Sequence, residues 1–443
     1  MRVAVIGVGH VGLVTAACMA DLGHEVVGVD DDPAKVEALG RDEVPFLEPD
    51  LPELVAEHRR AGRLRFTGEH AEAVPGAEVV FICVGTPRRD DGAPNLTYVQ
   101  QAAASVARHA DQPLVVSEKS TVPVRTGERI AQTLGLEARA AGGRHEHAVA
   151  SNPEFLREGT AVADTLEPDR VVVGADDERA HEVMRRLYQP LIDRVGCPYV
   201  ATDVATAELI KHASNAFLAT KISFINAVAG LCERTGADVE VVADAMGHDA
   251  RIGRAFLNAG LGYGGSCFPK DVEAFIHIAA DLGYDFGLLR ETHRINREAK
   301  GWPGVQLRRL LWNLDGKEVA VLGVAFKPGV DDVRDAPALD VIDELIAEGA
   351  RVRLHDPAAL AHVRDRYPQA RLTEDLGEAL DGAHAAVVCT EWDDYTSLDP
   401  AEVAQRLAYP VVVDARNCLD PDAWAKAGLR LAQVGRPMRE PEG

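Results

Sequence analysis

A chain of 443 residues is too long for a single hydrophobic core and fits two or three domains. Hydrophobic residues make up 47% and charged residues 26%, which is the composition of a soluble globular protein. With 47 Lys and Arg against 70 Asp and Glu, the formal net charge is −23. That charge argues against nucleic acid as a partner, yet still allows a small anionic substrate held by a few local cations.

Targeting and metal-binding patterns are not expected in this sequence. Glycines interrupt the apolar run at residues 3–6 almost at once, so no secretory signal is predicted. No stretch is expected to be long enough to span a membrane. The seven cysteines are scattered, with no CxxC and no His/Cys cluster at zinc spacing. Six of them read as small buried apolar residues of a reducing, cytoplasmic compartment, and Cys267 is the exception.

The first thirty residues carry the most specific local pattern. Residues 2–6, RVAVI, predict a buried parallel strand, followed by Gly7-Val8-Gly9-His10-Val11-Gly12 and a helix through about Leu22. A second strand at 25–29 ends at Asp30. Such a turn holds a pyrophosphate at the helix N-terminus, and the acid accepts hydrogen bonds from a ribose diol. The pattern predicts a dinucleotide site that favours NAD over NADP; a glycine-rich turn without a ligand is the alternative.

The rest of the chain predicts an α/β fold class with two Rossmann-like, doubly wound domains joined by a long central helix and a helical middle domain. Strands are expected at 79–84, 114–117, 149–151 and 170–174, and a long apolar helix at 202–234. A second unit begins near Lys317, with strands at 319–322, 351–354, 386–389 and 411–414 and a helix at 338–348. The expected domains are 1–200, 201–300 and 301–436, with a disordered tail at 437–443.

The octapeptide at 264–271, GGSCFPKD, is the second strong pattern. Small flexible residues before Cys267 favour an accessible thiol at a place where backbone N–H groups converge, which suits thiolate chemistry. Asp271 lies one turn further on if a helix starts at Pro269, and it could orient or deprotonate a water. A buried structural cysteine in a turn is an equal alternative on this octapeptide alone.

Two further pairs have helical spacing. Glu154 and Glu158, like Lys211 and Asn215, are four residues apart, so a helical turn would place each pair on one face. The alternative is a solvated acidic face and a surface lysine, which is the commoner fate of such pairs. Only convergence on Cys267 would favour a catalytic role.

The chain resembles the UDP-glucose/GDP-mannose dehydrogenase family over about residues 1–420. The octapeptide is similar to the nucleophile motif of the UDP-glucose dehydrogenases in that family. Further similar segments are the turn at 7–12, where His10 replaces the usual Tyr, then 84–87, 120–123, 151–159, 211–219, 326–328 and 331–334. Their order along the chain is far more specific than any one motif.

The resemblance implies an NAD-binding first domain, a dimerising central domain and a nucleotide-sugar-binding third domain. NAD would contact Gly7, Gly9, Val11, Gly12, Asp30, Lys35, Gly85, Thr86, Thr121, Glu158, Lys270 and Arg334. The catalytic residues would be Cys267, Lys211, Asn215, Asp271, Thr121, Glu154 and Glu158. The substrate would contact Glu154, Phe155, Leu156, Lys211, Asn215, Arg251, Phe256, Leu257, Gly264, Cys267, Phe268, Phe326 and Lys327. Arg251 resembles an arginine that reaches the neighbouring subunit's site, which implies at least a homodimer; a surface salt bridge is the alternative for Arg251 and Arg334.

The implied reaction is a four-electron oxidation of the C6 hydroxymethyl group of UDP-glucose that consumes two NAD. Lys211 and Asn215 would stabilise the oxyanion, and Thr121 with Asp271 would position a water that takes the proton. Cys267 would form a thiohemiacetal and then a thioester, which water hydrolyses with help from Glu154 or Glu158.

Other substrates and other classes of protein remain open at this stage. Phe268 after the cysteine and Pro123 favour UDP-glucose, whereas Val272, Ala227 and Asn95 depart from the family pattern. These departures would fit a different base, such as thymine, a modified sugar, or simple drift. The same chemistry on dTDP-glucose or GDP-mannose is the alternative. A non-catalytic NAD-binding regulator and an ordinary two-electron alcohol dehydrogenase are the alternatives from other classes.

Overall fold

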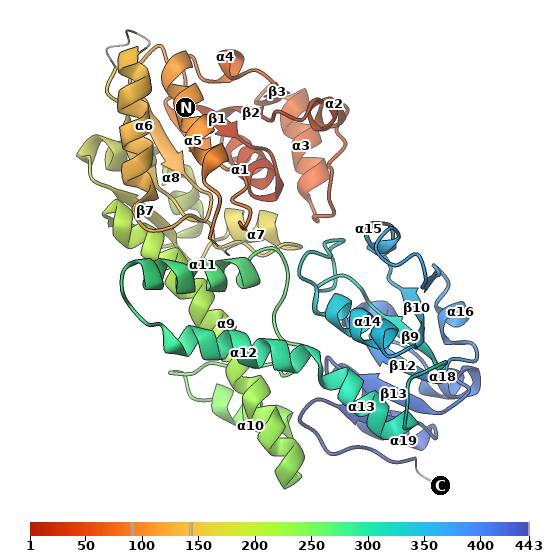
Figure 1. Ribbon diagram of the computed structural model, residues 1–443. Helices are drawn as coiled ribbons and strands as arrows, with labels where there is room; N and C mark the ends of the chain where they lie inside the picture. The colour runs from red at the N-terminus through yellow and green to blue at the C-terminus, as the bar shows by residue number, and fades with distance from the viewer. Residues whose placement is uncertain (90–92, 141, 143–144, 442–443) are drawn as a thin grey trace. The chain divides into compact units, whose positions relative to one another are not determined.

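The α/β fold class is confirmed by a computed structural model that describes residues 1–89, 93–140, 142 and 145–441. The chain divides into two compact units, the first made of Met1–Ser214 and His277–Leu282 and the second of the remaining described residues. Each unit contains one mainly parallel sheet with helices on both faces (Figure 1). Predicted strands and helices agree with the structure to within two residues at each end.

The first unit is built on an eight-stranded sheet of order β3-β2-β1-β4-β5-β6-β7-β8, parallel except between β6 and β7. Its central strands are apolar along their whole length because both faces are covered, as VVFI in β4 illustrates. The strands are β1 Arg2–Ile6, β2 Glu25–Val29, β3 Leu64–Thr67, β4 Val79–Ile82, β5 Val115–Glu118, β6 Ala148–Ser151, β7 Val171–Ala175 and β8 Tyr199–Thr202.

Helices cover the two faces of this sheet in separate groups. One face packs against α1 (His10–Asp21), α3 (Leu51–Arg60), α7 (Ala161–Leu166) and α8 (Glu178–Val195). The other packs against α4 (His70–Ala73), α5 (Thr97–His109) and α6 (Thr126–Ala140), of which α5 and α6 lie side by side (Figure 1). The short α2 (Pro33–Gly40) follows β2. This arrangement leaves the carboxyl ends of the parallel strands free to carry the loops predicted to bind ligands.

The second unit holds a six-stranded parallel sheet of order β11-β10-β9-β12-β13-β14. Its strands are β9 Glu318–Leu322, β10 Arg351–His355, β11 Arg371–Leu372, β12 Ala385–Val388, β13 Val411–Asp414 and β14 Arg430–Gln433. One face packs against α13 Trp302–Leu311, α14 Pro337–Ala347 and α15 Leu360–Val363. The other packs against α16 Leu376–Leu380, α17 Asp393–Thr396, α18 Pro400–Arg406 and α19 Pro421–Lys426.

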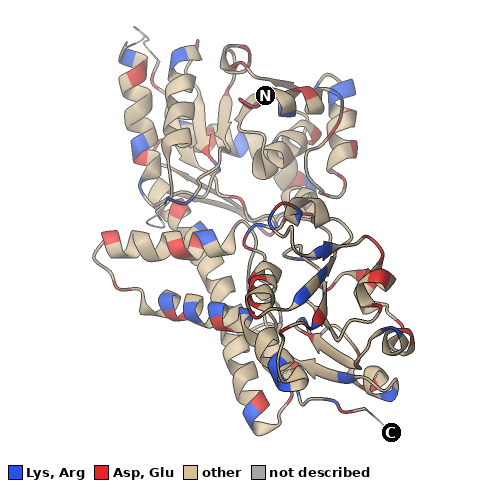
Figure 2. Cartoon of the chain, turned by 45° about the vertical axis from the view of Figure 1, so that its right-hand side comes forward, with Lys and Arg blue, Asp and Glu red and all other residues tan. Residues whose placement is uncertain are grey.

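Helices form the middle of the chain. They are α9 Val204–Thr235, α10 Val239–Gly247, α11 Phe268–Asp281 and α12 Gly287–Lys300. A row of basic residues along α12 is visible in Figure 2, and carboxylates pair with it: Arg294 with Glu291 and Glu298, and Lys300 with Asp340 at 2.8 Å. Charge on α12 is therefore largely neutralised locally.

The central helix α9 corrects the expectation that no stretch is long enough to span a membrane. Its 32 residues satisfy that test by length and hydropathy. Its polar residues nevertheless bond to other elements: Glu208 accepts hydrogen bonds from the backbone N–H groups of Arg125 at 2.6 Å and Gly127 at 2.8 Å. Burial raises the pKa of the Glu208 carboxyl to about 7. Glu208 of α9 thus fixes the start of α6, whereas only 39% of the most apolar window of α9 is buried.

Three other expectations need correction. Part of the predicted disorder at 437–443 is wrong, because the backbones of Leu431 and Arg439 exchange two hydrogen bonds of 3.0 Å. Cys418 is only half-buried, whereas the other five cysteines expected in the core are buried. The segment between Glu154 and Glu158 is an irregular loop and not a helical turn.

Candidate active site

The dinucleotide turn has the geometry that the glycine pattern predicts. Gly7 has φ +87, and its N–H donates to Val29 O at 2.8 Å. The N–H of Val8 donates to Asp30 Oδ2 at 3.0 Å, so the acid after β2 also fixes the turn after β1. A Cβ on Gly12 would lie 1.8 Å from Gly7 O, which explains why only glycine allows α1 to approach the strand.

A cavity of about 580 Å³ opens at this turn. It is lined by the dinucleotide turn, by Asp30 and Lys35, and by Gly85 of the second predicted NAD loop. The Lys35 ammonium lies 2.9 Å from both carboxylate oxygens of Asp30. Tyr98 on α5 also lines the cavity, although sequence reasoning did not select it. Helix N-terminus, glycine backbone and buried acid together fit the pyrophosphate and ribose of NAD.

Two glycine substitutions should separate folding from cofactor binding. Gly12→Ala forces a methyl into the Gly7 carbonyl, so we expect unfolding to become easier by about 1–3 kcal/mol or more and NAD binding to be lost. Gly9→Ala should keep the wild-type melting temperature, because nothing lies within 4 Å of its Cβ and its φ is −73. Its methyl would obstruct the pyrophosphate and weaken NAD binding about tenfold or more. Thermal unfolding and calorimetric NAD titration test both; a Gly12→Ala variant as stable as wild type would contradict this account.

The two polar loops after β4 and β5 are bonded to each other. Thr86 Oγ1 donates to Thr121 O at 3.1 Å, and Ser120 Oγ donates to Val84 O at 2.7 Å. His212 Nε2 lies 2.6 Å from Val122 O, so α9 contacts the loop at 120–123 that carries Thr121. The structure therefore brings Gly85, Thr86 and Thr121 together at the carboxyl ends of neighbouring strands, as predicted.

Glu154 and Lys211 form a buried ion pair. Lys211 Nζ donates to Glu154 Oε1 at 2.8 Å, and each side chain is only 6% exposed. The other carboxylate oxygen of Glu154 accepts the N–H of Leu156 at 2.8 Å. The ring of Phe155 lies under the guanidinium of Arg170 at 3.9 Å and under the Lys211 ammonium at 5.5 Å. The surface-lysine alternative is therefore wrong for Lys211.

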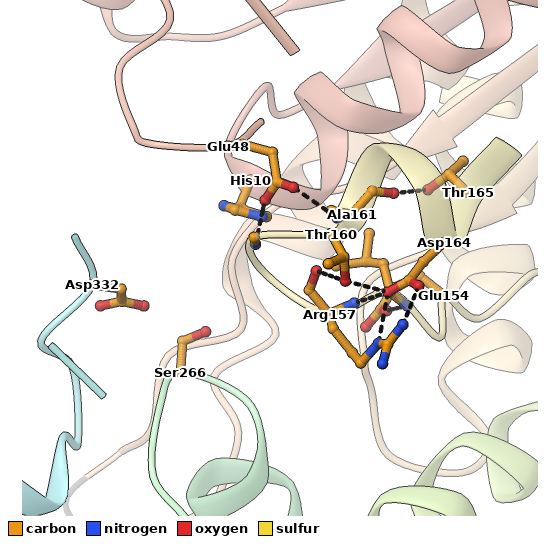
Figure 3. Close-up of polar contacts among 12 residues, drawn as sticks. His10, Glu48, Glu154, Arg157, Thr160, Ala161, Asp164, Thr165, Ser266 and Asp332 are labelled. Carbon is orange, nitrogen blue, oxygen red and sulfur yellow. Dashed lines mark hydrogen bonds and ion pairs between the residues drawn. The ribbon is translucent and has the colours of Figure 1, made fainter. Parts of the chain in front are cut away.

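The loop after Glu154 is held by side chains that Figure 3 shows together. Arg157 donates to Asp164 from its guanidinium and its backbone, and Glu158 is buried. Glu48, from the segment between α2 and α3, accepts backbone hydrogen bonds at the far end of this loop. Sequence reasoning missed Glu48, because a contact across more than 100 residues leaves no local pattern.

A buried lysine beside this loop was also missed. Lys119 at the end of β5 donates to Asn152 Oδ1 at 3.0 Å, and Asn152 Nδ2 donates to Val172 O at 2.7 Å. Burial lowers the pKa of the Lys119 ammonium. Its only sequence signal is a lysine directly after a buried strand. The network fixes the backbone two residues before Glu154.

In the second unit, Cys267 lies directly before α11, and Asp271 is one helical turn further on. The N–H of Asp271 donates to Cys267 O at 2.8 Å, so the predicted helix start is confirmed to within a residue. Asp271 is 2% exposed and accepts from Asn215 Nδ2 at 2.6 Å and from Lys270 Nζ at 2.7 Å. Cys267 is half-buried, with its Sγ 3.5 Å from Ser266 Oγ.

The glycines before Cys267 allow close backbone packing within the second unit. Gly265 has φ +81, and a Cβ there would lie 2.8 Å from the ring of Phe326. A Cβ on Gly264 would lie 2.4 Å from Asp335 O. The loop that carries the thiol thus packs directly on the loop that carries Phe326 and Lys327.

Aromatic residues surround the start of α11. The rings of Phe256 and Tyr263 lie 6.2 and 6.1 Å from that of Phe268, and Leu257 is buried beside this cluster. Phe256 has φ +64, which is unusual for a bulky residue. The cluster provides an apolar surface next to the Cys267 loop.

Arg251 and Arg334 make the local ion pairs that were considered as the alternative for them. Arg251 pairs with Asp249 at 2.6 Å, and Arg334 with Asp332 at 2.7 Å. The Arg251 side chain is 88% exposed in the single chain.

Three domain models of one protein family match most of this chain. Residues 1–192 match the NAD binding domain of the UDP-glucose/GDP-mannose dehydrogenase family, residues 205–298 its central domain and residues 320–421 its UDP binding domain. The UDP-glucose 6-dehydrogenases of Bacillus subtilis and Pseudomonas aeruginosa are 41% and 44% identical over 444 and 449 residues. The alignments cover 100% and 99% of this chain and 99% and 98% of those proteins.

Solved structures of two dehydrogenases have the same fold as this chain. A UDP-glucose dehydrogenase from the hyperthermophilic archaeon Pyrobaculum islandicum is 39% identical, with a TM-score of 0.91 over 98% of both chains. A UDP-D-ManNAc dehydrogenase from Pyrococcus horikoshii is 28% identical, with a TM-score of 0.87 over 98% of this chain and 99% of that one.

Fold, dinucleotide turn and family matches define this chain as an NAD-dependent dehydrogenase. It belongs to the UDP-glucose/GDP-mannose dehydrogenase family, and the resemblance stated from its motifs is confirmed.

Proposed function

We propose that this enzyme oxidises the C6 hydroxymethyl group of UDP-glucose to a carboxylate, consuming two NAD and one water and releasing two NADH. The observation that carries the proposal is the group at the start of α11, where Cys267 precedes Asp271 and Asp271 accepts from Asn215 at 2.6 Å. Full-length relatives at 41% and 44% identity are UDP-glucose 6-dehydrogenases, which supports UDP-glucose as the substrate.

In the first oxidation, the alcohol loses a proton and a hydride to become an aldehyde. The cavity beside the dinucleotide turn would hold part of the NAD, which supplies the hydride acceptor when bound. Lys211 and Asn215, one turn apart on α9, would stabilise the developing oxyanion, and Thr121 with Asp271 would position the water that takes the proton. The carboxylate of Asp271 accepts hydrogen bonds from Asn215 and Lys270, which hold it in the place from which it would position that water.

In the second oxidation, the Cys267 thiolate adds to the aldehyde carbon and forms a thiohemiacetal. Loss of a second hydride gives a thioester, and attack by water breaks the C–S bond to release the uronate and regenerate the thiolate. Glu154 or Glu158, both buried, would serve as the base or orient this water. Covalent capture keeps the reactive aldehyde from escaping.

The remaining site residues would bind the two nucleotides. NAD would contact Lys270 and Arg334 besides the dinucleotide turn, and the nucleotide sugar would contact Phe155, Leu156, Phe256, Leu257, Gly264, Phe268, Phe326 and Lys327. The proposed units of this machinery are an NAD-binding domain at 1–200, a central domain at 201–300 and a nucleotide-sugar domain at 301–436. Arg251 would leave Asp249 to enter the neighbouring subunit's site, so the proposed active form is at least a homodimer. The proposed location of the enzyme is the cytoplasm.

The test is NADH formation from a limiting, known amount of UDP-glucose, followed to completion by absorbance. Two NADH per sugar are expected from the four-electron reaction. One NADH with free aldehyde would contradict the covalent mechanism and indicate an ordinary alcohol dehydrogenase. Reaction only with dTDP-glucose or GDP-mannose would retain the chemistry and change the substrate, whereas inactivity with all three would favour a non-catalytic NAD-binding protein.

A further inference from the structure

His10 lies inside the dinucleotide turn, yet its side chain is engaged with a distant segment of the first unit. It is the first residue of α1, and its ring stacks on Phe46 with centroids 4.4 Å apart and planes at 29°. Its Nε2 lies 3.0 Å from Glu48 Oε2, and the two side chains are 16% and 0% exposed (Figure 3). The imidazole is therefore oriented by a ring on one side and a buried carboxylate on the other.

Glu48 also accepts hydrogen bonds at the end of the loop that contains Glu154 and Glu158. Its Oε2 accepts the N–H of Gly159 and its Oε1 accepts the N–H of Ala161, both at 2.7 Å. Gly159 has φ +80, and Ala161 begins α7. One carboxylate thus fixes the point at which the loop turns into the helix (Figure 3).

Removing the imidazole would leave the fully buried Glu48 carboxylate without one of its neighbours. The Glu48 carboxylate has no solvent access, so the loss of the imidazole that faces it costs more than the loss of a surface ion pair. The Glu48 carboxylate would then move toward water, and its hydrogen bonds with the N–H groups of Gly159 and Ala161 would break. The effect of a change at His10 therefore reaches the loop at 154–161 through Glu48.

We propose that His10 is a positioning residue that couples the dinucleotide turn to the loop of Glu154 and Glu158 through Glu48. The turn lines the cavity proposed for NAD, and the loop carries the two acids proposed to assist hydrolysis of the thioester. The coupling therefore links the cofactor site to the loop of these acids. This inference rests on the proposed function only for the role of the two acids. The coupling itself concerns NAD binding and the backbone of the first unit.

Hydrogen–deuterium exchange of the intact enzyme tests the coupling without any turnover. NAD should slow amide exchange in a peptide spanning 156–162 by about tenfold in the wild type. His10→Phe keeps the stack on Phe46 but lacks the ring nitrogen that lies 3.0 Å from Glu48 Oε2, so this protection should vanish. His10→Gln restores a polar group of similar reach toward Glu48 and should recover most of the protection. His181→Phe removes a different half-buried imidazole, which contacts Ala175 O at 3.0 Å, and should leave the protection unchanged.

Kinetics with the nucleotide sugar give the second readout. His10→Phe should lower kcat about 10- to 100-fold while the Kd for NAD stays within about threefold of wild type, and His10→Gln should recover most of the rate. Equal protection in wild type and His10→Phe would overturn the inference, and so would equal damage in the Phe and Gln variants. Normal exchange coupling in a wild-type enzyme that produces no NADH from any nucleotide sugar would instead overturn the proposed function alone.

Discussion

Cys267→Ser is expected to stop uronate formation and to leave NAD binding intact. Serine has nearly the same shape, so the start of α11 and its contact with Ser266 should survive. A hydroxyl is too weak a nucleophile to capture the aldehyde, and the rate of NADH formation should fall by three orders of magnitude or more, on the order of other nucleophile replacements. Burst measurements should show at most one NADH per site.

Cys418→Ser provides the matched control. Cys418 is the other half-buried cysteine, and its Sγ lies 3.6 Å from Asp414 Oδ1 in the same unit. Serine there can keep that contact, so the yield of two NADH per UDP-glucose should not change. If Cys267→Ser turned over like the wild type, the thiol would be removed from the mechanism.

Lys211→Met is expected to reduce both stability and catalysis. It leaves the Glu154 carboxylate buried without its ammonium partner, so the free energy of unfolding should fall by about 3–5 kcal/mol. Loss of the cation assigned to the oxyanion should also lower kcat by about 100- to 1,000-fold. Urea unfolding and steady-state kinetics at saturating NAD measure the two effects separately.

The double variant Lys211→Met with Glu154→Gln separates these contributions. A neutral pair should recover much of the lost stability, because no buried charge remains, while kcat stays low. Arg41→Met serves as the surface control: its pair with Glu37 is 52% and 76% exposed, and we expect no measurable change. Recovery of kcat in the double variant would show that Lys211 acts only on stability.

Much of the fold follows from the sequence because both sheets are covered on both faces. Buried strands such as VVFI at 79–82 are apolar throughout, and glycine turns mark their ends. The strands that were missed lack that signal. The edge strand β8, YVAT, is half-exposed to exposed, and β11 has two residues. Such strands exist because a neighbouring strand offers hydrogen bonds, which a local pattern does not reveal.

Some residues of the candidate site could be predicted from short motifs, and others could not. Cys267, Asp271 and Asn215 were selected from short motifs, and the structure joins Asn215 to Asp271 within one unit. The helical spacing of Glu154 and Glu158 was misleading, because Pro153 and the fixed end at Glu48 favour an irregular loop. Lys119 and Glu48 act through tertiary contacts. Glu48 has no local pattern that would select it, and the position of Lys119 after a buried strand does not reveal its partner.

In both sheets a glycine with positive φ follows the first central strand and an acid follows the next strand, with different chemical consequences. Gly323 has φ +95 after β9, much as Gly7 has φ +87 after β1, and Asp356 follows β10 as Asp30 follows β2. Asp356, however, accepts backbone N–H groups from Val324, Ala325, Ala358 and Ala359 at 2.7–3.0 Å, with the Trp392 indole at 3.3 Å.

Five donors exhaust the lone pairs of one carboxylate, so Asp356 has no acceptor left for a ribose. At Asp30 one of the donors is the ammonium of Lys35, whose side chain is 26% exposed and can yield its place to hydroxyl groups. The second sheet thus keeps the arrangement of a nucleotide-binding fold, but Asp356 stabilises the backbone around it and cannot bind a ribose. Equilibrium binding should accordingly saturate at one NAD per polypeptide.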